Sequence, residues 1–394
     1  MISKKDTIEI NFFFGPSDKL EESFDLSEAQ SHTTLLQLAA KLDSMRFMSK
    51  EGPIEFEENT LIVWPEEFFG VQDNFTNSLW RSILGTNLRK VYVINPPKSL
   101  VEQAKLLFTE SSIHEKHYIH KKIDTALIRN ITKTLSQSIL GQDEALKALP
   151  RCLASLMNTK ESPVVIMLYG PTGVGKTESA KIIASALGGE ASRIQFSMFQ
   201  TNSLAEYLYG SKVNERSFAA QLLERRSNVI ILDEFDKTGE AFHSAFYQLF
   251  DEGLFVDKNY IVDLRNTLIV CTSNYSSPQE IRKYLGEPLS SRFSAFIRYS
   301  ELTNPAKLTI IKRKIDEIYG TFPDDIRLLI NRDKIESDFL PTLLKLNNVR
   351  EITSSIEYIM SDFILSSKGS SEDIENISQR VTSERKLDTG DLAG

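Results

Sequence analysis

The strongest chemical signal in the sequence is the segment GPTGVGKT at residues 170–177. It follows the apolar run VVIMLY and opens a helical pattern, which is the context in which a glycine-rich loop wraps phosphate with its amide groups. Lys176 can reach the β- and γ-phosphates of a nucleotide, and the Thr177 hydroxyl is placed to ligate Mg²⁺. The segment predicts a phosphate-binding loop made of Gly170, Pro171, Thr172, Gly173, Val174, Gly175, Lys176 and Thr177.

Two adjacent acidic residues follow a second apolar run. Val229 to Leu232 are typical of a buried strand, which would bring Asp233 and Glu234 to its carboxyl end, where open α/β sheets bind ligands. Asp233 would hold the magnesium ion, directly or through water, and Glu234 would polarise the water that attacks the γ-phosphate. Without the phosphate loop, such a pair would be read as a solvated strand end.

A third apolar run, TLIVCTSN, ends at Asn274. Its amide could hold the attacking water or the γ-phosphate from the side opposite Glu234, although an asparagine after a strand also forms turns. Cys271 lies within this run, and a packed core thiol is the favoured interpretation for it.

These motifs require a parallel sheet to position them. Between about residues 127 and 299, helical patterns alternate with fully apolar strands, which indicates a sheet covered by helices on both faces. Residues 305–318 and 339–365 have helical patterns, and the residues that follow are polar, which predicts a small helical domain and a flexible tail.

The first 120 residues alternate short strand and helix patterns, with strands expected at residues 8–14, 61–64 and 91–94. They predict a small α/β domain that contains no recognisable nucleotide, metal or nucleophile motif. The expected domains are residues 1–120, 121–300 and 301–366, followed by the tail at 367–394.

The charge, hydrophobic content and cysteine count of the chain exclude several classes of protein. The 394 residues carry a formal charge of −8 and are 41% hydrophobic, which is typical of a globular chain and argues against nonspecific binding to nucleic acid or to an anionic membrane. No apolar run near a motif approaches the roughly 20 residues that span a bilayer. Only Cys152 and Cys271 are present, so a disulfide framework and a four-cysteine zinc site are excluded. We expect a cytoplasmic location.

Three histidines lie in the polar stretch SSIHEKHYIHKK at residues 111–122, which we expect to be a connecting helix. Neighbouring pairs three residues apart could share a helix face and bind a metal, but His114 and His120 would lie on different sides. A solvated linker is the favoured interpretation over a metal site.

The motifs together resemble the AAA+ ATPases, and within them the Clp-type chaperones, especially the second ATPase module of the ClpB and ClpA proteins. The resemblance covers about residues 139–365 and rests on pieces in family order: ILGQDEAL at 139–146, GPTGVGKT at 170–177, VIILDEFDK at 229–237, VDLRNTLIVCTSN at 262–274, GEPLSSRF at 286–293 and NNVREI at 347–352. It implies an AAA+ α/β domain followed by a helical lid, with ATP and Mg²⁺ as ligands, and assembly into a ring, which is expected to be a hexamer.

The resemblance also implies roles for single residues. Ile139 and Leu140 would flank the adenine, and Asn274 matches the first sensor residue of the family. Arg292 matches the arginine finger, which reaches the nucleotide of a neighbouring subunit, and Arg350 matches the second sensor arginine. Charge on the γ-phosphate oxygens in the transition state explains why arginines are needed there. The alternative for both arginines is a surface salt bridge. Arg265 also matches the family, and a structural or interface role is expected for it.

The chain departs from the family at the substrate end. Residues 208–218, LYGSKVNERSF, are shorter than the family segment and lack its Gly-Tyr-Val-Gly pore loop. Tyr207 or Tyr209 could grip a threaded chain instead, although each is more typical of helix packing. Two hypotheses follow: a ring ATPase that remodels a protein partner chosen by the amino-terminal domain, or a nucleotide-gated switch or scaffold of the torsin or defence-associated kind. A DNA-loading ATPase is less favoured because no basic stripe is present.

Overall fold

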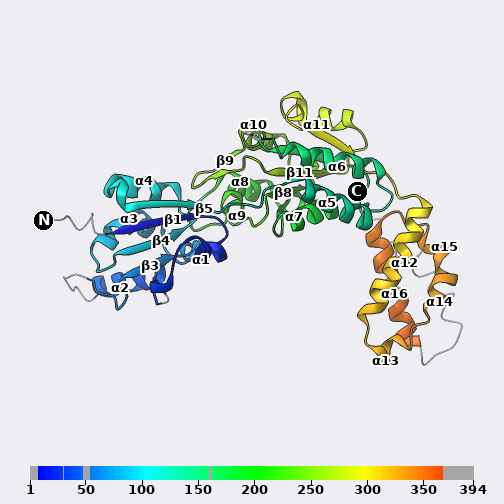
Figure 1. Cartoon of the computed structure of the whole chain (residues 1–394), viewed down its shortest axis with the longest axis horizontal. Coiled ribbons are helices and arrows are strands. Elements are labelled where there is room, and N and C mark those ends of the chain that lie inside the picture. Colours follow the sequence, from blue (N-terminus) through cyan, green and yellow to red (C-terminus); the bar gives the residue numbers. More distant parts are fainter. Residues whose placement is uncertain (1–7, 30, 48–53, 159–161, 367–394) are drawn as a thin grey trace.

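The computed structural model describes residues 8–29, 31–47, 54–158 and 162–366. Figure 1 shows them in a row: an amino-terminal part (β1 to β5), a central part (α5 to β12) and a helical part (α12 to α16). No helix among these residues is long and apolar enough to cross a membrane.

The amino-terminal part is built on a parallel sheet. Its strands are β1 (Glu9–Phe14), β2 (Thr33–Thr34), β3 (Thr60–Val63), β4 (Lys90–Ile94) and β5 (Ile113–His117), in the order β2-β3-β4-β1-β5. Side chains alternate between its two faces, as the period of a strand requires. One face packs on α2 (Leu35–Phe47), α3 (Asp73–Leu84) and α4 (Lys98–Leu107), and the other packs on the short helix α1 (Leu20–Ser23).

The prediction of a connecting helix at residues 111–122 is wrong. Instead, a short 3₁₀ turn (Glu110–Ser112) leads into β5, which pairs with β1 from Ile113 opposite Ile10 to His117 opposite Phe14. β5 is an edge strand whose side chains are mostly exposed, so it needs no apolar run, and periodicity alone could not reveal it. Among the described residues no group of three or more His, Cys, Asp or Glu side chains converges as a metal site would require.

The central part is a second parallel sheet, covered on both faces as predicted. Its strands are β6 (Val164–Tyr169), β7 (Ser192–Gln195), β8 (Val229–Asp233), β11 (Leu268–Ser273) and β12 (Ala295–Arg298), in the order β12-β6-β11-β8-β7. The side chains of β6, β8 and β11 are all buried, which explains their continuous apolar sequence. Cys271 is among them, as expected for a core thiol.

Helices complete both faces of this sheet. One face packs on α5 (Thr125–Ser138), α6 (Asp143–Ser155) and α7 (Lys176–Ala186). The other packs on α8 (Thr201–Tyr209), α9 (Phe218–Leu223), α10 (Tyr247–Glu252) and α11 (Pro278–Ser290). A hairpin of β9 (Leu254–Val256) and β10 (Ile261–Asp263) projects from this part.

The helical part contains the helix predicted at 305–318, whereas the pattern predicted at 339–365 is divided into two helices, of which the longer begins at Val349. The two long helices, α12 (Asn304–Thr321) and α16 (Val349–Ser366), pack together with the shorter α13 (Asp324–Arg327), α14 (Arg332–Lys334), the π-turn Ile335–Phe339 and α15 (Leu340–Leu343). The tail expected at 367–394 lies outside the described residues.

A partly buried carboxylate joins the amino-terminal and central parts. Glu224, just after α9, accepts hydrogen bonds from the Ser17 amide and hydroxyl at 2.8 Å each and from the Asn95 amide. Asn95 in turn is hydrogen-bonded to both main-chain groups of Gly15 at 2.9 Å. Burial raises the pKa of Glu224, and the three donors oppose that rise. This cluster fixes the turn after β1 against the central part.

Further contacts join the amino-terminal part to the β9–β10 turn and to segment 208–218, which corresponds to the family's pore-loop segment. The Lys98 amide donates to the Asn259 carbonyl at 2.8 Å, and its ammonium group donates to the Asp257 carbonyl at 3.0 Å. Val213 packs against the core of the amino-terminal part. Segment 208–218 and the β9–β10 turn are therefore partly covered by the amino-terminal part.

Replacing Glu224 with alanine tests this junction. The change leaves the Ser17 and Asn95 donors without their acceptor, which costs roughly 2 kcal/mol or more for hydrogen bonds to a charged group. We expect the amides of residues 15–18 to exchange hydrogen at least about tenfold faster, while the central sheet stays protected. Glu206→Ala, at an exposed position of α8, is the control. Unchanged exchange in Glu224→Ala would show that the contact does not hold the parts together.

Candidate functional site

The phosphate-loop segment forms a tight turn between β6 and α7. Gly170 and Gly173 have φ angles of 131° and 70°, which favour glycine. A Cβ at Gly170 would overlap the Tyr299 carbonyl, and one at Gly173 would overlap Asn348. Helix α7 starts at Lys176, so its amino end, with free amide groups, faces the loop.

Lys176 is held at the centre of the loop. Its ammonium group donates to the Gly170 and Pro171 carbonyls at 2.6 Å each and to the Asn274 amide oxygen at 3.2 Å. Burial lowers the pKa of Lys176 to about 8, although the nearby Asp233 opposes that shift. The loop therefore presents a positive charge that lacks much of its usual hydration.

Asp233 ends β8 with its carboxylate almost fully buried. One oxygen accepts from the Thr177 hydroxyl at 3.1 Å and from the Thr272 hydroxyl. The other accepts from both Nε, at 3.0 Å, and Nη2 of Arg193. Because Thr177 and Asp233 bring two hard oxygen donors together, they fit a magnesium ion that keeps several waters.

Glu234 follows in a left-handed backbone conformation, with φ 56° and ψ 46°. This conformation is uncommon for a non-glycine residue, and the amide of Glu234 is fixed by the Thr272 hydroxyl at 3.0 Å. Its carboxylate accepts from the Gln195 amide at 3.4 Å. The turn places Asp233 and Glu234 in different environments, although they are adjacent in sequence.

These groups line one cavity of about 550 Å³. Of the residues predicted from sequence, the cavity is lined by Ile139, Leu140, Thr172, Gly173, Val174, Gly175, Lys176, Thr177, Asp233, Glu234, Asn274 and Arg350. Gly170 and Pro171 do not line the cavity themselves, but their carbonyl groups accept hydrogen bonds from Lys176, which does.

The helical part closes one side of the cavity. Arg350, together with Arg313 and Lys314 of α12, lines it. The amide of Val349 donates to the Gly173 carbonyl at 3.0 Å, so α16 begins directly against the phosphate loop. The position of the helical part is thus coupled to the conformation of the loop.

Arg292 does not line the cavity of its own chain. Its guanidinium pairs with Asp251 at 2.6 Å, lies over the Tyr247 ring at 4.9 Å from the centroid, and donates to the Pro288 carbonyl. The structure therefore separates Arg292 from the other predicted site residues.

The two tyrosines considered as grips differ in their surroundings. Tyr207 packs in the core of the central part, stacks on Phe199 with ring centroids 4.9 Å apart, and donates to the Gln221 side chain. Tyr209 is 43% exposed, and its hydroxyl lies 3.3 Å from that of Ser244. Arg265 pairs with Asp263 at the other end of the central sheet.

Among the polar cavity residues that sequence reasoning missed, three contact Asp233 or Glu234. Arg193 and Gln195 stand on β7, and Thr272 stands on β11. The alternation in SRIQ, with polar residues on both sides of Ile194, was a signal that β7 has a polar face. Nothing in the sequence showed that this face meets Asp233, because that depends on β7 pairing with β8.

Comparisons with known proteins agree with this geometry. Residues 161–313 match the family model described as AAA domain (Cdc48 subfamily). The AAA+ ATPase ClpV1 of Pseudomonas aeruginosa is 32% identical over 201 residues, covering 44% of this chain and 22% of that protein. The chaperone protein ClpB of Oceanobacillus iheyensis is 28% identical over 295 residues, covering 70% of this chain and 35% of that protein.

Two further relatives extend the comparison. The negative regulator of genetic competence ClpC/MecB of Bacillus subtilis is 28% identical over 290 residues, covering 68% of this chain and 35% of that protein. The solved Hsp104–ADP complex of S. cerevisiae matches with a TM-score of 0.51 at 19% identity, over 62% of this chain and 49% of that one, which supports the fold alone.

The chain spans only about a fifth to a third of the length of these curated relatives, at 22% to 35%. The predicted fold class, a parallel AAA+ sheet with helices on both faces and a helical part after it, is confirmed. The phosphate loop, the buried acidic strand end and the sequence matches lead to one conclusion: residues 161–313 form an AAA domain similar to those of the Clp-type AAA+ ATPases.

Proposed function

We propose that the chain binds ATP with Mg²⁺ in the 550 Å³ cavity and hydrolyses it to ADP and phosphate. The observation that carries this proposal is the convergence of Lys176, Asp233, Glu234, Asn274 and Arg350 from separate elements on one cavity. Positioning and electrostatic stabilisation are the main requirements of phosphoryl transfer, and this set provides both.

The phosphate loop and Lys176 would bind the β- and γ-phosphates, exchanging the contacts of Lys176 with the Gly170 and Pro171 carbonyls for phosphate oxygens. Ile139 and Leu140 supply an apolar wall for the base. Thr177 and Asp233 would hold the magnesium ion, which when bound neutralises developing charge on the phosphate oxygens.

Glu234 is assigned the role of general base. The oxygen of a water molecule attacks the γ-phosphorus, the bond from that phosphorus to the departing ADP oxygen breaks, and Glu234 accepts the water proton. Asn274 would orient the water or the γ-phosphate from the opposite side. The Gln195 side chain donates a hydrogen bond to the Glu234 carboxylate and would hold that carboxylate in place until ATP binds.

Arg292 is proposed to act on the nucleotide of a neighbouring subunit. It lies outside its own cavity and is pre-oriented by Asp251 and Tyr247, so it can contribute to catalysis only in an oligomer. We further propose that the chain assembles into a ring, a hexamer as the resemblance to Clp proteins implies, and that this ring remodels a protein partner chosen by the amino-terminal part.

A second function is favoured by one observation. The amino-terminal part covers segment 208–218 through Val213 and contacts the β9–β10 turn through Lys98. A chain threaded past these loops would meet that part, and the Gly-Tyr-Val-Gly loop is missing. In the second candidate, nucleotide binding therefore controls assembly or release of the amino-terminal part, as in a switch or scaffold ATPase.

Glu234→Gln tests the catalytic assignment. Glutamine keeps the size of the side chain and the adjacent magnesium site but cannot take the water proton. We expect ATP turnover to fall by about 100-fold or more while ATP affinity stays within a few-fold. Turnover measured by phosphate release would contradict the assignment if it stayed near the wild-type rate. Asp236→Asn, in the same loop, is the comparison for a general charge effect.

The lowered pKa of Lys176 predicts that nucleotide affinity depends on pH. Its pKa of about 8 means that the ammonium group is charged at pH 7 and mostly neutral at pH 9. Affinity for ADP should fall as pH rises through 8, because a proton must then be taken up on binding; titration calorimetry in two buffers would measure that uptake. In Lys176→Arg, which does not titrate in this range, the uptake should vanish, whereas its persistence would assign it to another group. Lys176→Ala should weaken ADP binding itself.

The proposed action of Arg292 across subunits is tested by mixing two inactive proteins. Arg292→Ala and Glu234→Gln should each lose activity, but mixed oligomers contain interfaces with both an intact finger and an intact base. We expect mixing to restore part of the ATP turnover, and the restored fraction should rise with protein concentration. In a separate measurement, the mass of the Glu234→Gln protein in solution should increase when ATP is added. Arg298→Ala, an exposed arginine of β12, should remain active. A monomeric mass with ATP bound, and no recovery on mixing, would exclude the role.

A further inference from the structure

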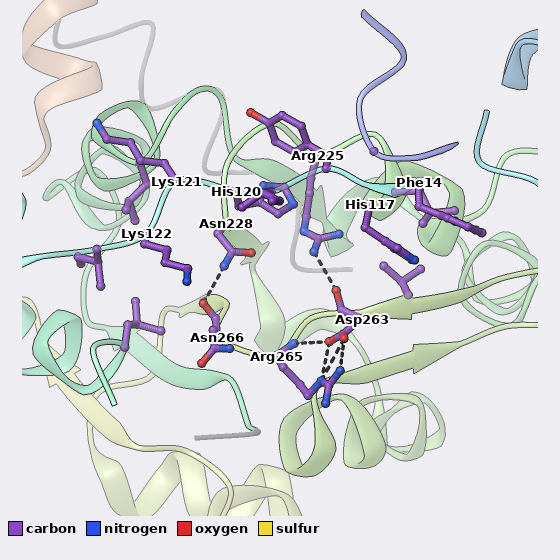
Figure 2. Close-up of a pocket in the computed structure, with 18 of the residues that line it drawn as sticks. Phe14, His117, His120, Lys121, Lys122, Arg225, Asn228, Asp263, Arg265 and Asn266 are labelled. Atoms are coloured by element: carbon purple, nitrogen blue, oxygen red, sulfur yellow. Dashed lines mark hydrogen bonds and ion pairs between the residues drawn. The ribbon is translucent and has the colours of Figure 1, made fainter. Parts of the chain in front are cut away.

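A second cavity, of about 690 Å³, lies between the amino-terminal and central parts (Figure 2). On one side it is lined by Phe14 and Gly15 at the end of β1 and by the connector 117–123. On the other it is lined by Asn228 and Asn266, which precede β8 and β11. It therefore lies at the amino edge of the central sheet, opposite the edge that carries the proposed ATP site.

The position relative to the first sheet favours a ligand. In open parallel sheets, ligands bind beyond the carboxyl ends of the strands, where the connections diverge to opposite faces. After β1 the chain passes to α1 on one face, while α2, α3 and α4 cover the other. The carboxyl end of β1 is therefore the point of divergence, and it opens into this cavity.

The lining is rich in positive charge, although the chain as a whole carries −8. Lys121, Lys122, Arg225 and Arg265 line the cavity, with Asp263 as the acidic residue among them. Asp263 is already paired with Arg265, whose Nε lies 3.0 Å from each of its oxygens. The positive charges of Lys121, Lys122 and Arg225 remain, and they would attract an anion into the cavity.

Arg225 is the most informative residue of the lining. It is only 9% exposed, and its guanidinium donates to the main-chain carbonyls of Leu222 at 2.9 Å and Asp263 at 2.8 Å. Its Nε has no partner among the described residues. Burial lowers its pKa to about 10, yet it remains a cation at neutral pH. Among the described residues no carboxylate forms an ion pair with Arg225, although the charge of the nearby Asp263 favours its charged form. A buried cation without an ion-pair partner is costly, and a bound anion would compensate its charge.

Aromatic and apolar groups complete the walls. His117 stacks on Phe14 with ring centroids 4.7 Å apart, and His120 meets Tyr118 edge-on at 5.0 Å. Nδ1 of His120 is buried without a partner, and burial together with Arg225 lowers the pKa of this histidine to about 4. The neutral imidazole can therefore accept a hydrogen bond from a ligand.

We propose that this cavity binds a small organic anion that combines a planar ring with one phosphate or carboxylate group and is about the size of a nucleoside monophosphate. Arg225 and Lys122 would bind the acidic group, and the aromatic side chains would contact the ring. A volume of about 690 Å³ lies in the range of sites for such ligands. Because both parts of the molecule supply walls, occupancy would strengthen their association. This proposal does not depend on ATP hydrolysis.

Titration calorimetry on the full chain tests it. The protein is first saturated with Mg²⁺ and ADP, so that binding at the phosphate loop is removed from the signal. The probes are the four common 5′-nucleoside monophosphates, benzoate, inorganic phosphate and uncharged adenosine. We expect at least one probe that has both a ring and an acidic group to bind one to one, more tightly than phosphate or adenosine.

Variants then locate the binding. Arg225→Met should weaken the tightest probe by about tenfold or more, since it removes charge-assisted hydrogen bonds, whereas Arg226→Met, at the neighbouring exposed arginine, should not. Ile261→Trp, at the exposed mouth of the cavity, should block binding without changing charge and covers the case in which Arg225→Met does not fold. The proposal is overturned if no probe with a ring and an acidic group binds, if adenosine binds equally well, or if the folded variants bind as the wild type does.

Discussion

The parallel pairing of β11 between β6 and β8 is the constraint on which the rest of the structure depends. Ser273 lies opposite Tyr169, and Cys271 lies opposite Leu232, so the three strands end at one edge of the sheet. Residues separated by about a hundred positions in sequence thereby meet within hydrogen-bond distance, as Lys176 and Asn274 do at 3.2 Å. A shift of one residue in this register would turn the side chains of the shifted strand to the opposite face and destroy the site.

The same edge explains why the helical part is coupled to the phosphate loop. Tyr299, directly after β12, approaches Gly170 so closely that no side chain fits there, and its hydroxyl donates to Ser179 of α7 at 2.7 Å. From Tyr299 the chain continues into α12, and it returns at Val349 to hydrogen-bond Gly173. The helical part is thus attached to the loop at both ends, and a change in the loop on binding phosphate would be felt by Arg350.

The opposite edge of the central sheet has a different role. There the amino-terminal part is held by Glu224, whose carboxylate accepts hydrogen bonds from Ser17, in the turn after β1, and from Asn95. This docking partly covers segment 208–218 through Val213 and leaves the basic cavity around Arg225 open between the two parts. The two edges of one sheet therefore separate the proposed nucleotide chemistry from the contacts that join the two parts.

The phosphate loop, the strand that carries Asp233 and Glu234, and the helix at 305–318 follow from the sequence alone, because these features are local: a glycine pattern, a short apolar run and a helical period. The helical pattern at 339–365 is divided in the structure into α15 and α16, because the chain turns back between them to reach the phosphate loop. It also indicated the fold class, since fully apolar strands that alternate with helices form covered parallel sheets. The remaining features depend on how distant segments pack together. β5 is polar and was predicted to be helical, because its stability comes from pairing with β1 and not from its own side chains. The contacts of Arg193 with Asp233, of Glu224 with Ser17 and of Arg292 with Asp251 join residues from different elements, so they exist only once strand order and docking are set.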